Sequence, residues 1–167
     1  MFDGRLSLRR LRRRCAARVR ELPMPDPFDV RALCDLVAGQ RGRPIELVPI
    51  TERQGVLGLW VATDDSDLIF YEEATTLPHQ DHIILHELCH LLCDHYAAPL
   101  PGAELMPHLD PEMVRSVLGR TGYSAVEEQE AELLASLILQ QAGQPAAPPA
   151  EGLAHRISDA LNWSDPR

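Results

Sequence analysis

Two histidines lie four positions apart within an apolar run that has helical periodicity. The run, Ile83–Leu92, reads Ile-Ile-Leu-His-Glu-Leu-Cys-His-Leu-Leu and contains the pattern HExxH. On a helix, His86 and His90 project from one face one turn apart, so both imidazoles can bind the same tetrahedral metal ion. Glu87 is then placed to act on a water at that metal. The pattern predicts a zinc-binding helix and the hydrolysis of an amide bond.

Apolar residues around the histidines predict that this helix is buried. They form one stripe, which consists of Ile83, Ile84, Leu88, Leu91 and Leu92. Thr76 and Pro78 are typical of a helix start. We favour metal binding over the alternative that His86 and His90 are polar residues on the solvent face of an amphipathic helix.

A second helix is predicted from Tyr123 to about Gln141, and its acids differ in their expected roles. Ser124, followed three residues later by Glu127, forms a capping box, which gives Glu127 a local role at the helix start. Solvent exposure is expected for two further acids, Glu130 and Glu132.

Glu128 is the predicted third metal ligand. A catalytic zinc site normally has three protein ligands and an open position for water, and HExxH supplies two of them. Glu128 shares a helix face with Ala131 and Ala135, and these small residues would let the two helices approach closely. The alternatives are Glu132, then Glu127, and also the thiolate of Cys93.

Three features of the sequence resemble the ImmA/IrrE family of small, gluzincin-like metallo-endopeptidases. Two strands, at residues 58–63 and 68–72, precede the metal helix, as in that family. His86–Leu92 resembles the family's HELGH-type helix, and Glu128–Ala135 resembles its E-x-x-A-N-x-F-A helix. The resemblance covers about residues 28 to 141.

The resemblance implies a cytoplasmic, regulatory zinc endopeptidase that cleaves or displaces a helix-turn-helix transcriptional repressor. The metal ligands that it implies are His86, His90 and Glu128. It also implies that Glu87 is the general base. Cys89 stands where the family has glycine, and Glu132 and Leu134 stand where it has asparagine and phenylalanine.

The expected fold is α+β, with a small antiparallel or mixed sheet packed on helices. The HExxH helix carries the active site and the second helix supplies the third ligand. We predict one zinc metallopeptidase-like domain with flanking segments: an arginine-rich helix or arm at 1–22, the domain at 23–142, a proline- and glycine-rich linker at 143–152, and a short helix or tail at 153–167.

Further elements follow from local signals in the sequence. Asp29 is expected to cap a helix over 30–38 that ends at Gly39, and another helix is expected over 110–118. Residues 44–50 read as a strand, and the two later strands as a hairpin turned at 64–67. The strand at residues 57–61 either holds the substrate backbone at the sheet edge or only covers the core.

Positive charge is concentrated at the N-terminus. Residues 1–20 contain one acid, Asp3, and eight arginines: Arg5, Arg9, Arg10, Arg12, Arg13, Arg14, Arg18 and Arg20. Because the whole chain has a formal net charge of −9, direct nucleic-acid binding is expected only through this arm. Leu8, Leu11, Cys15 and Val19 recur at helical spacing, and we favour an amphipathic helix that packs on the rest of the protein.

Other functions and roles stay open at this point. A metal-stabilised binding protein, which sequesters a repressor or belongs to a toxin–antitoxin pair, would need no catalysis. Weak candidates for an oxyanion donor are Tyr123, His95 and His108, and His82 is expected to face solvent. The sequence shows no 18-residue apolar stretch and no signal peptide, so a cytoplasmic location without membrane contact is expected, with reduced cysteines.

Overall fold

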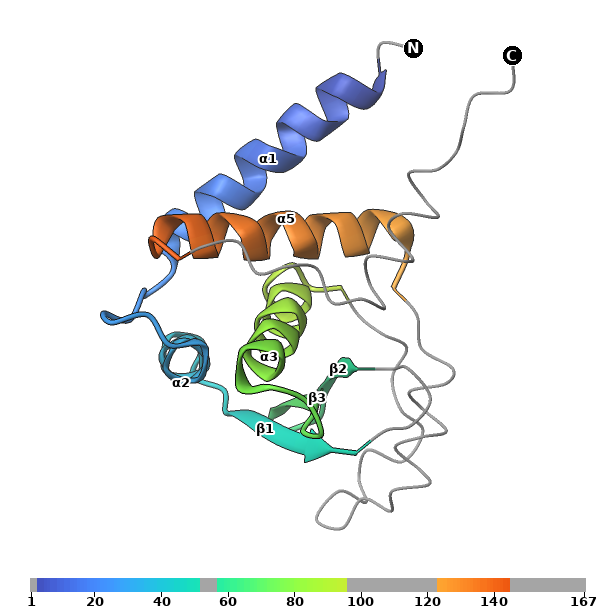
Figure 1. The fold of residues 1–167 in the computed structure, drawn as a ribbon. Coiled ribbons are helices and arrows are strands. Elements are labelled where there is room, and N and C mark those ends of the chain that lie inside the picture. The colour runs from blue at the N-terminus through green and yellow to red at the C-terminus, as the bar shows by residue number, and fades with distance from the viewer. Residues whose placement is uncertain (1–2, 52–56, 96–122, 145–167) are drawn as a thin grey trace.

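The computed structural model describes residues 3–51, 57–95 and 123–144, which form an α+β fold. Over these residues there are four helices and one three-stranded mixed sheet (Figure 1). The elements are α1 (Asp3–Glu21), α2 (Val30–Arg41), β1 (Ile45–Ile50), β2 (Gly58–Ala62), β3 (Asp67–Glu72), α3 (Leu77–Leu92) and α5 (Ala125–Gln141). The predicted fold class is therefore confirmed at this level. The helix expected over 110–118, the short helix or tail at 153–167 and the part of the linker beyond Gln144 lie outside the described residues.

The sheet has the order β1-β3-β2, so β2 forms one of its edges. β3 is parallel to β1 and antiparallel to β2, with Leu47 opposite Ile69 and Trp60 opposite the same Ile69. All six residues of β3 are buried, as expected of a central strand. The hairpin of β2 and β3 leaves β2 beside α3, which carries the HExxH residues.

Asp67 fixes the geometry of this hairpin. Its side chain is buried, and it accepts hydrogen bonds from Trp60 Nε1 at 3.1 Å and from Arg43 Nε at 3.1 Å. Arg43 also donates to the carbonyl oxygen of Ser66 at 2.7 Å. A buried carboxylate is stable only when it is paired, and here the partners come from β2 and from the segment before β1. Asp67, expected in the turn, is thus the first residue of β3.

α2 is three residues longer than predicted. It runs through Gly39 to Arg41 and ends at Gly42, whose φ of 65° is left-handed. The Gly42 and Arg43 amides donate to the carbonyl oxygens of Gly39 and Ala38, at 3.3 and 3.1 Å. Glycine adopts this backbone conformation at little cost, which makes Gly42 the effective stop signal. The expected end at Gly39 was wrong.

α3 lies between the sheet and α5, and α1 crosses α5 on its other side (Figure 1). The fully buried side chains of Ile84 and Leu88 from α3 meet those of Leu134 and Ile138 from α5 in one core. Burying a side chain of this size contributes roughly 1.5–3 kcal/mol. The core therefore determines how α3 and α5 face each other.

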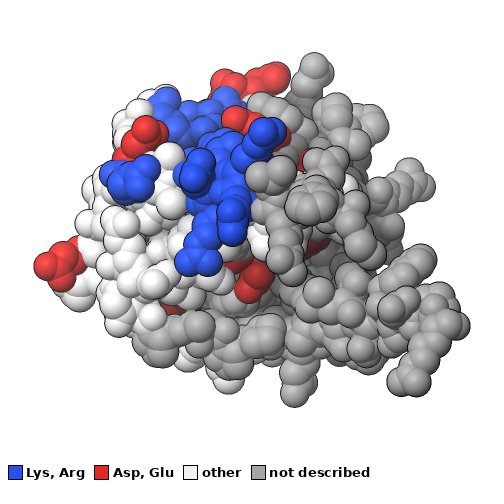
Figure 2. Space-filling model, turned by 90° about the horizontal axis from the view of Figure 1, so that it is seen from above, with Lys and Arg blue, Asp and Glu red and all other residues white. Residues whose placement is uncertain are grey.

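α1 is an amphipathic helix packed on α5, as favoured from the sequence. Leu11, Cys15 and Val19 are buried, whereas Leu8 is 49% exposed, so the apolar stripe begins later than expected. Basic side chains gather on the face of the molecule that Figure 2 shows from above. The exposed arginines of α1, called the basic patch below, are Arg9, Arg10, Arg12, Arg13, Arg14 and Arg20. None of the helices in the described ranges is both long enough and apolar enough to cross a membrane.

Candidate metal centre

His86, His90 and Glu128 come together between α3 and α5. The Nε2 atoms of the two histidines are 3.1 Å apart. Glu128 Oε2 lies 3.2 Å from His86 Nε2, and Glu128 Oε1 lies 3.8 Å from His90 Nε2. Three potential ligand atoms from two helices therefore face one point, and the group could hold a metal ion.

The donor set is compatible with a zinc ion. Two imidazole nitrogens and one carboxylate are a known ligand set for zinc, which holds nitrogen at about 2.0–2.1 Å in tetrahedral geometry. Two nitrogens bound in this way lie about 3.3 Å apart, close to the separation of the two Nε2 atoms. Ala131 and Ala135 are buried in the contact between the helices. Their small side chains allow the close approach that places Glu128 beside the histidines.

The alternative third ligands occupy other positions. Glu127 belongs to the capping box, where its carboxylate accepts from the Ser124 amide at 2.7 Å. Glu132 Oε2 is 3.6 Å from Nδ1 of His86, on the opposite side of that ring from Glu128. Cys93 groups with other residues, away from His86. Among these acids and thiols, only Glu128 faces the Nε2 atoms of both histidines.

The two histidines differ in protonation before any metal binds. Burial lowers the pKa of His90 to about 4, so its imidazole is neutral and offers a lone pair. Burial also acts to lower the pKa of His86, but the carboxylates of Glu128 and Glu132 outweigh it and raise that pKa to about 10. Although burial opposes ionisation of Glu128, its contacts with both histidines hold its pKa at about 2. A cation at this position would take the place of the His86 proton.

Metal uptake at about pH 8 is expected to release roughly one proton from His86 per zinc ion, beyond any proton that a zinc-bound water loses, because His86 must lose its proton to bind. A histidine of ordinary pKa 6.5 would already be neutral at this pH and release almost none. Titration calorimetry in two buffers of different ionisation enthalpy measures the number of protons. Equal apparent enthalpies in the two buffers would contradict the protonated state of His86.

Glu87 is buried on the β2 side of α3. Burial raises its pKa to about 7, although His86 and the hydroxyl of Tyr123 act in the opposite direction. Tyr123 donates to Glu87 Oε2 at 3.3 Å. A carboxylate with a pKa near neutrality can both accept and return a proton, which is the property of a general acid–base residue.

Tyr123 connects Glu87 to the histidine pair. Its ring stacks on His90, with 3.4 Å between ring centroids and an interplanar angle of 9°. Burial raises the pKa of the Tyr123 phenol far above its usual range, so the hydroxyl remains a neutral donor. The sequence suggested Tyr123 only as a weak oxyanion donor, and the structure places its hydroxyl on Glu87.

Comparisons of the chain with protein-family models, with curated proteins and with solved structures found no match. The functional interpretation therefore depends on the geometry of the described side chains. That geometry brings the two histidines of HExxH together with the predicted third ligand.

Behind His90 lies a chain of residues that the sequence did not predict. His90 Nδ1 is 3.0 Å from His95 Nδ1, and His95 Nε2 is 3.1 Å from Glu130 Oε2. The other oxygen of Glu130 accepts from Arg14 Nε and Nη2, at 3.0 and 2.6 Å. Both His95 and Glu130 are buried. Glu130 was expected in solvent, and that expectation was wrong because α1 covers its side of α5.

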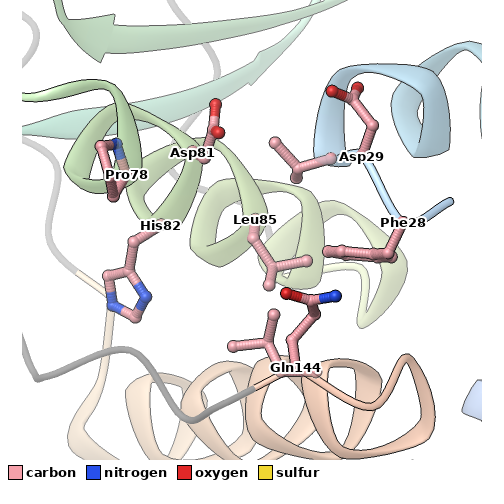
Figure 3. A pocket seen from close by; sticks show the side chains of 9 residues that line it. Phe28, Asp29, Pro78, Asp81, His82, Leu85 and Gln144 are labelled. Carbon is pink, nitrogen blue, oxygen red and sulfur yellow. The ribbon is translucent and has the colours of Figure 1, made fainter.

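His82 was also expected in solvent, yet it is buried. It lines a cavity of about 230 Å³ between α3, the start of α2 and the end of α5 (Figure 3). Neither ring nitrogen has a hydrogen-bond partner among the described residues, and burial lowers the pKa of this histidine. His82 does not belong to the group of converging ligand atoms formed by His86, His90 and Glu128. His108 lies outside the described residues.

A side chain at Gly58 is expected to destabilise the protein and to disturb Glu87. A Cβ atom there would lie 2.6 Å from Ile83 Cγ2 and 2.9 Å from Glu87 Oε1. Such overpacking costs about 1–3 kcal/mol, so urea denaturation should show a lower free energy of unfolding for Gly58→Ala. The matched control is Gly39→Ala inside α2, where nothing lies within 4 Å and the change should stabilise by about 1 kcal/mol. Equal stabilities for the two variants would contradict the close packing of β2 on α3.

Proposed function

We propose that the protein is a zinc-dependent endopeptidase of the HExxH type. The observation that carries the proposal is the convergence of His86, His90 and Glu128 with the buried carboxylate of Glu87 beside them. The resemblance of the two helices to the ImmA/IrrE pattern supports the same conclusion. Zinc is the metal that best suits two imidazoles and one carboxylate in a hydrolytic site.

When bound, zinc would polarise the scissile carbonyl group and lower the pKa of a water molecule. Glu87 accepts the proton of that water and delivers it to the leaving amine. Tyr123 holds the Glu87 carboxylate through its hydroxyl and supports the His90 ring by stacking. These contacts fix the base and one ligand in their relative positions, which reduces the reorganisation needed for reaction.

The edge strand β2 is the proposed docking place for the substrate backbone. Within the described ranges its only strand partner is β3. Glu87 accepts a hydrogen bond from the backbone of Trp60 in β2, and a Cβ atom at Gly58 would lie 2.9 Å from Glu87 Oε1. An extended peptide that pairs with a sheet edge gains backbone hydrogen bonds and is held straight. At β2, such a peptide would pass close to the proposed base. By the resemblance, the substrate is a helix-turn-helix repressor in the cytoplasm.

New peptide termini provide the test of this function. Proteins extracted from the source cells are incubated with the zinc-loaded wild type or with Glu87→Gln, and new N-termini are identified by mass spectrometry. A few new termini with the wild type alone are the expected result. If both forms retain the same partner and neither produces termini, the chain is a non-proteolytic binding protein, which sequesters a repressor or acts in a toxin–antitoxin pair.

A further inference from the structure

The contacts behind His90 also form a group of potential metal ligands. Cys93, His95 and Glu130 offer ligand atoms within 4.8 Å of one another. The group begins 3.0 Å from His90, between the His90 and His95 Nδ1 atoms. Two interpretations compete: a second metal site, or a set of hydrogen bonds that serves the first one.

Counting protons on the two imidazoles distinguishes these interpretations. A neutral imidazole has one donor and one acceptor nitrogen. If His90 Nε2 binds the metal, Nδ1 carries the proton and must donate to His95 Nδ1. His95 then carries its own proton on Nε2 and donates to Glu130 Oε2. The remaining Glu130 oxygen accepts from Arg14, so every contact joins one donor to one acceptor.

A second metal ion on His95 is incompatible with this arrangement. A metal at His95 Nε2 would leave the proton on Nδ1, where it would face the proton on His90 Nδ1 across 3.0 Å. Two donors would then meet with no acceptor between them. Arg14 adds a positive charge beside Glu130, and Arg18 donates to the carbonyl oxygen of Leu92 nearby. The charge of the Glu130 carboxylate is therefore already balanced by Arg14, which does not favour a second metal ion there.

We propose that His95, Glu130 and Arg14 form a positioning chain that holds His90 in the tautomer presenting Nε2 to the metal. This inference rests on the proposed metal site and deepens it. Through Arg14, helix α1 becomes part of the support of the centre. The remaining α1 arginines of the basic patch do not touch Glu130 by any hydrogen bond in the described structure. Of two neighbouring arginines, Arg14 therefore belongs to the positioning chain and Arg13 does not.

Zinc affinity, measured by competition with a chelator, tests the positioning chain. His95→Ala is expected to weaken binding by about 10- to 100-fold, which is typical for loss of a hydrogen-bond partner of a ligand. His95→Asn places an amide oxygen near the position of Nδ1, so it should recover most of the affinity if it accepts the His90 proton. Arg14→Ala is expected to weaken binding, while Arg13→Ala, an equal change of charge one residue away, leaves it unchanged.

The tautomers provide a readout that a general loss of stability would not change. Nitrogen-15 spectra of the zinc-loaded wild type should show the His95 proton on Nε2 and the His90 proton on Nδ1. Two metal ions per chain, with a thiolate-to-cobalt absorption band after cobalt substitution, would overturn the proposal in favour of a second site. Unchanged affinity in His95→Ala, or equal affinities in Arg13→Ala and Arg14→Ala, would overturn the positioning chain but leave the proposed metal centre standing. A wild type that binds no zinc overturns the metal centre as well.

Discussion

Replacing Glu87 by glutamine is expected to lower kcat/KM for peptide hydrolysis by about 10²- to 10⁴-fold while one zinc ion remains bound. The amide has nearly the shape of the carboxylate but cannot take the proton from water. Because Glu87 does not belong to the converging ligand atoms, metal content should stay at the wild-type level. The measurement uses a peptide that spans the bond identified from the new N-termini, together with zinc analysis of the same samples.

The matched control for this variant is Glu46→Gln, which makes the same chemical change on the exposed part of β1. It should leave kcat/KM unchanged. A loss of folding in Glu87→Gln is not expected, since burial already raises the pKa of Glu87 to about 7 and disfavours its charged form. Full activity of Glu87→Gln, with an intact metal site, would remove Glu87 as the base and with it the proposed mechanism.

Removing one of the proposed metal ligands is expected to cause the second large effect, a loss of zinc affinity. His86→Ala and Glu128→Ala should each weaken zinc binding by more than the roughly 10- to 100-fold that outer partners contribute, because each removes one of three direct bonds. Zinc content after dialysis against a mild chelator, followed by affinity measurement, gives the result. Glu128→Gln, which keeps the shape but loses the charge, should also weaken binding.

His79→Ala is the control for the histidine variants. His79 lies on the same helix, but its Nδ1 contacts Thr75 Oγ1 at 2.7 Å, and it does not belong to the group of converging ligand atoms. Its removal should not change zinc content. If Glu128→Ala keeps its metal while His86→Ala loses it, the third ligand must be another acid, and Glu132 is then the first to examine because it lies on the other side of the His86 ring.

Local sequence patterns predicted the parts of the site that lie on one helix. HExxH fixes the relative positions of His86 and His90 because helix geometry alone separates them by one turn. Small residues at Ala131 and Ala135 identified the face of α5 that meets α3, and Glu128 lies on that face as expected. The capping box at Ser124 is also present, because it needs only residues within a single turn.

Contacts between distant segments could not be predicted in the same way. Glu130 lies two positions from Glu128 and therefore on nearly the opposite side of α5, which looked like solvent until α1 was placed there. His82 is buried for a similar reason, since α2 and the end of α5 close around it. In α2, the sequence pattern indicated Gly39 as the stop, but the helix continues to Gly42, whose left-handed backbone ends it.

The two carboxylates of α5 have a consequence for how the molecule assembles. Glu128 faces α3 and Glu130 faces α1, so one rigid helix contacts both the metal ligands and the N-terminal helix. Any preference of the metal for the docked state of α1 must be matched by an equal preference of docked α1 for the metal, because coupling free energies are reciprocal. Metal binding would then favour docking of the N-terminal helix, and docking of that helix would raise the affinity for the metal by the same factor.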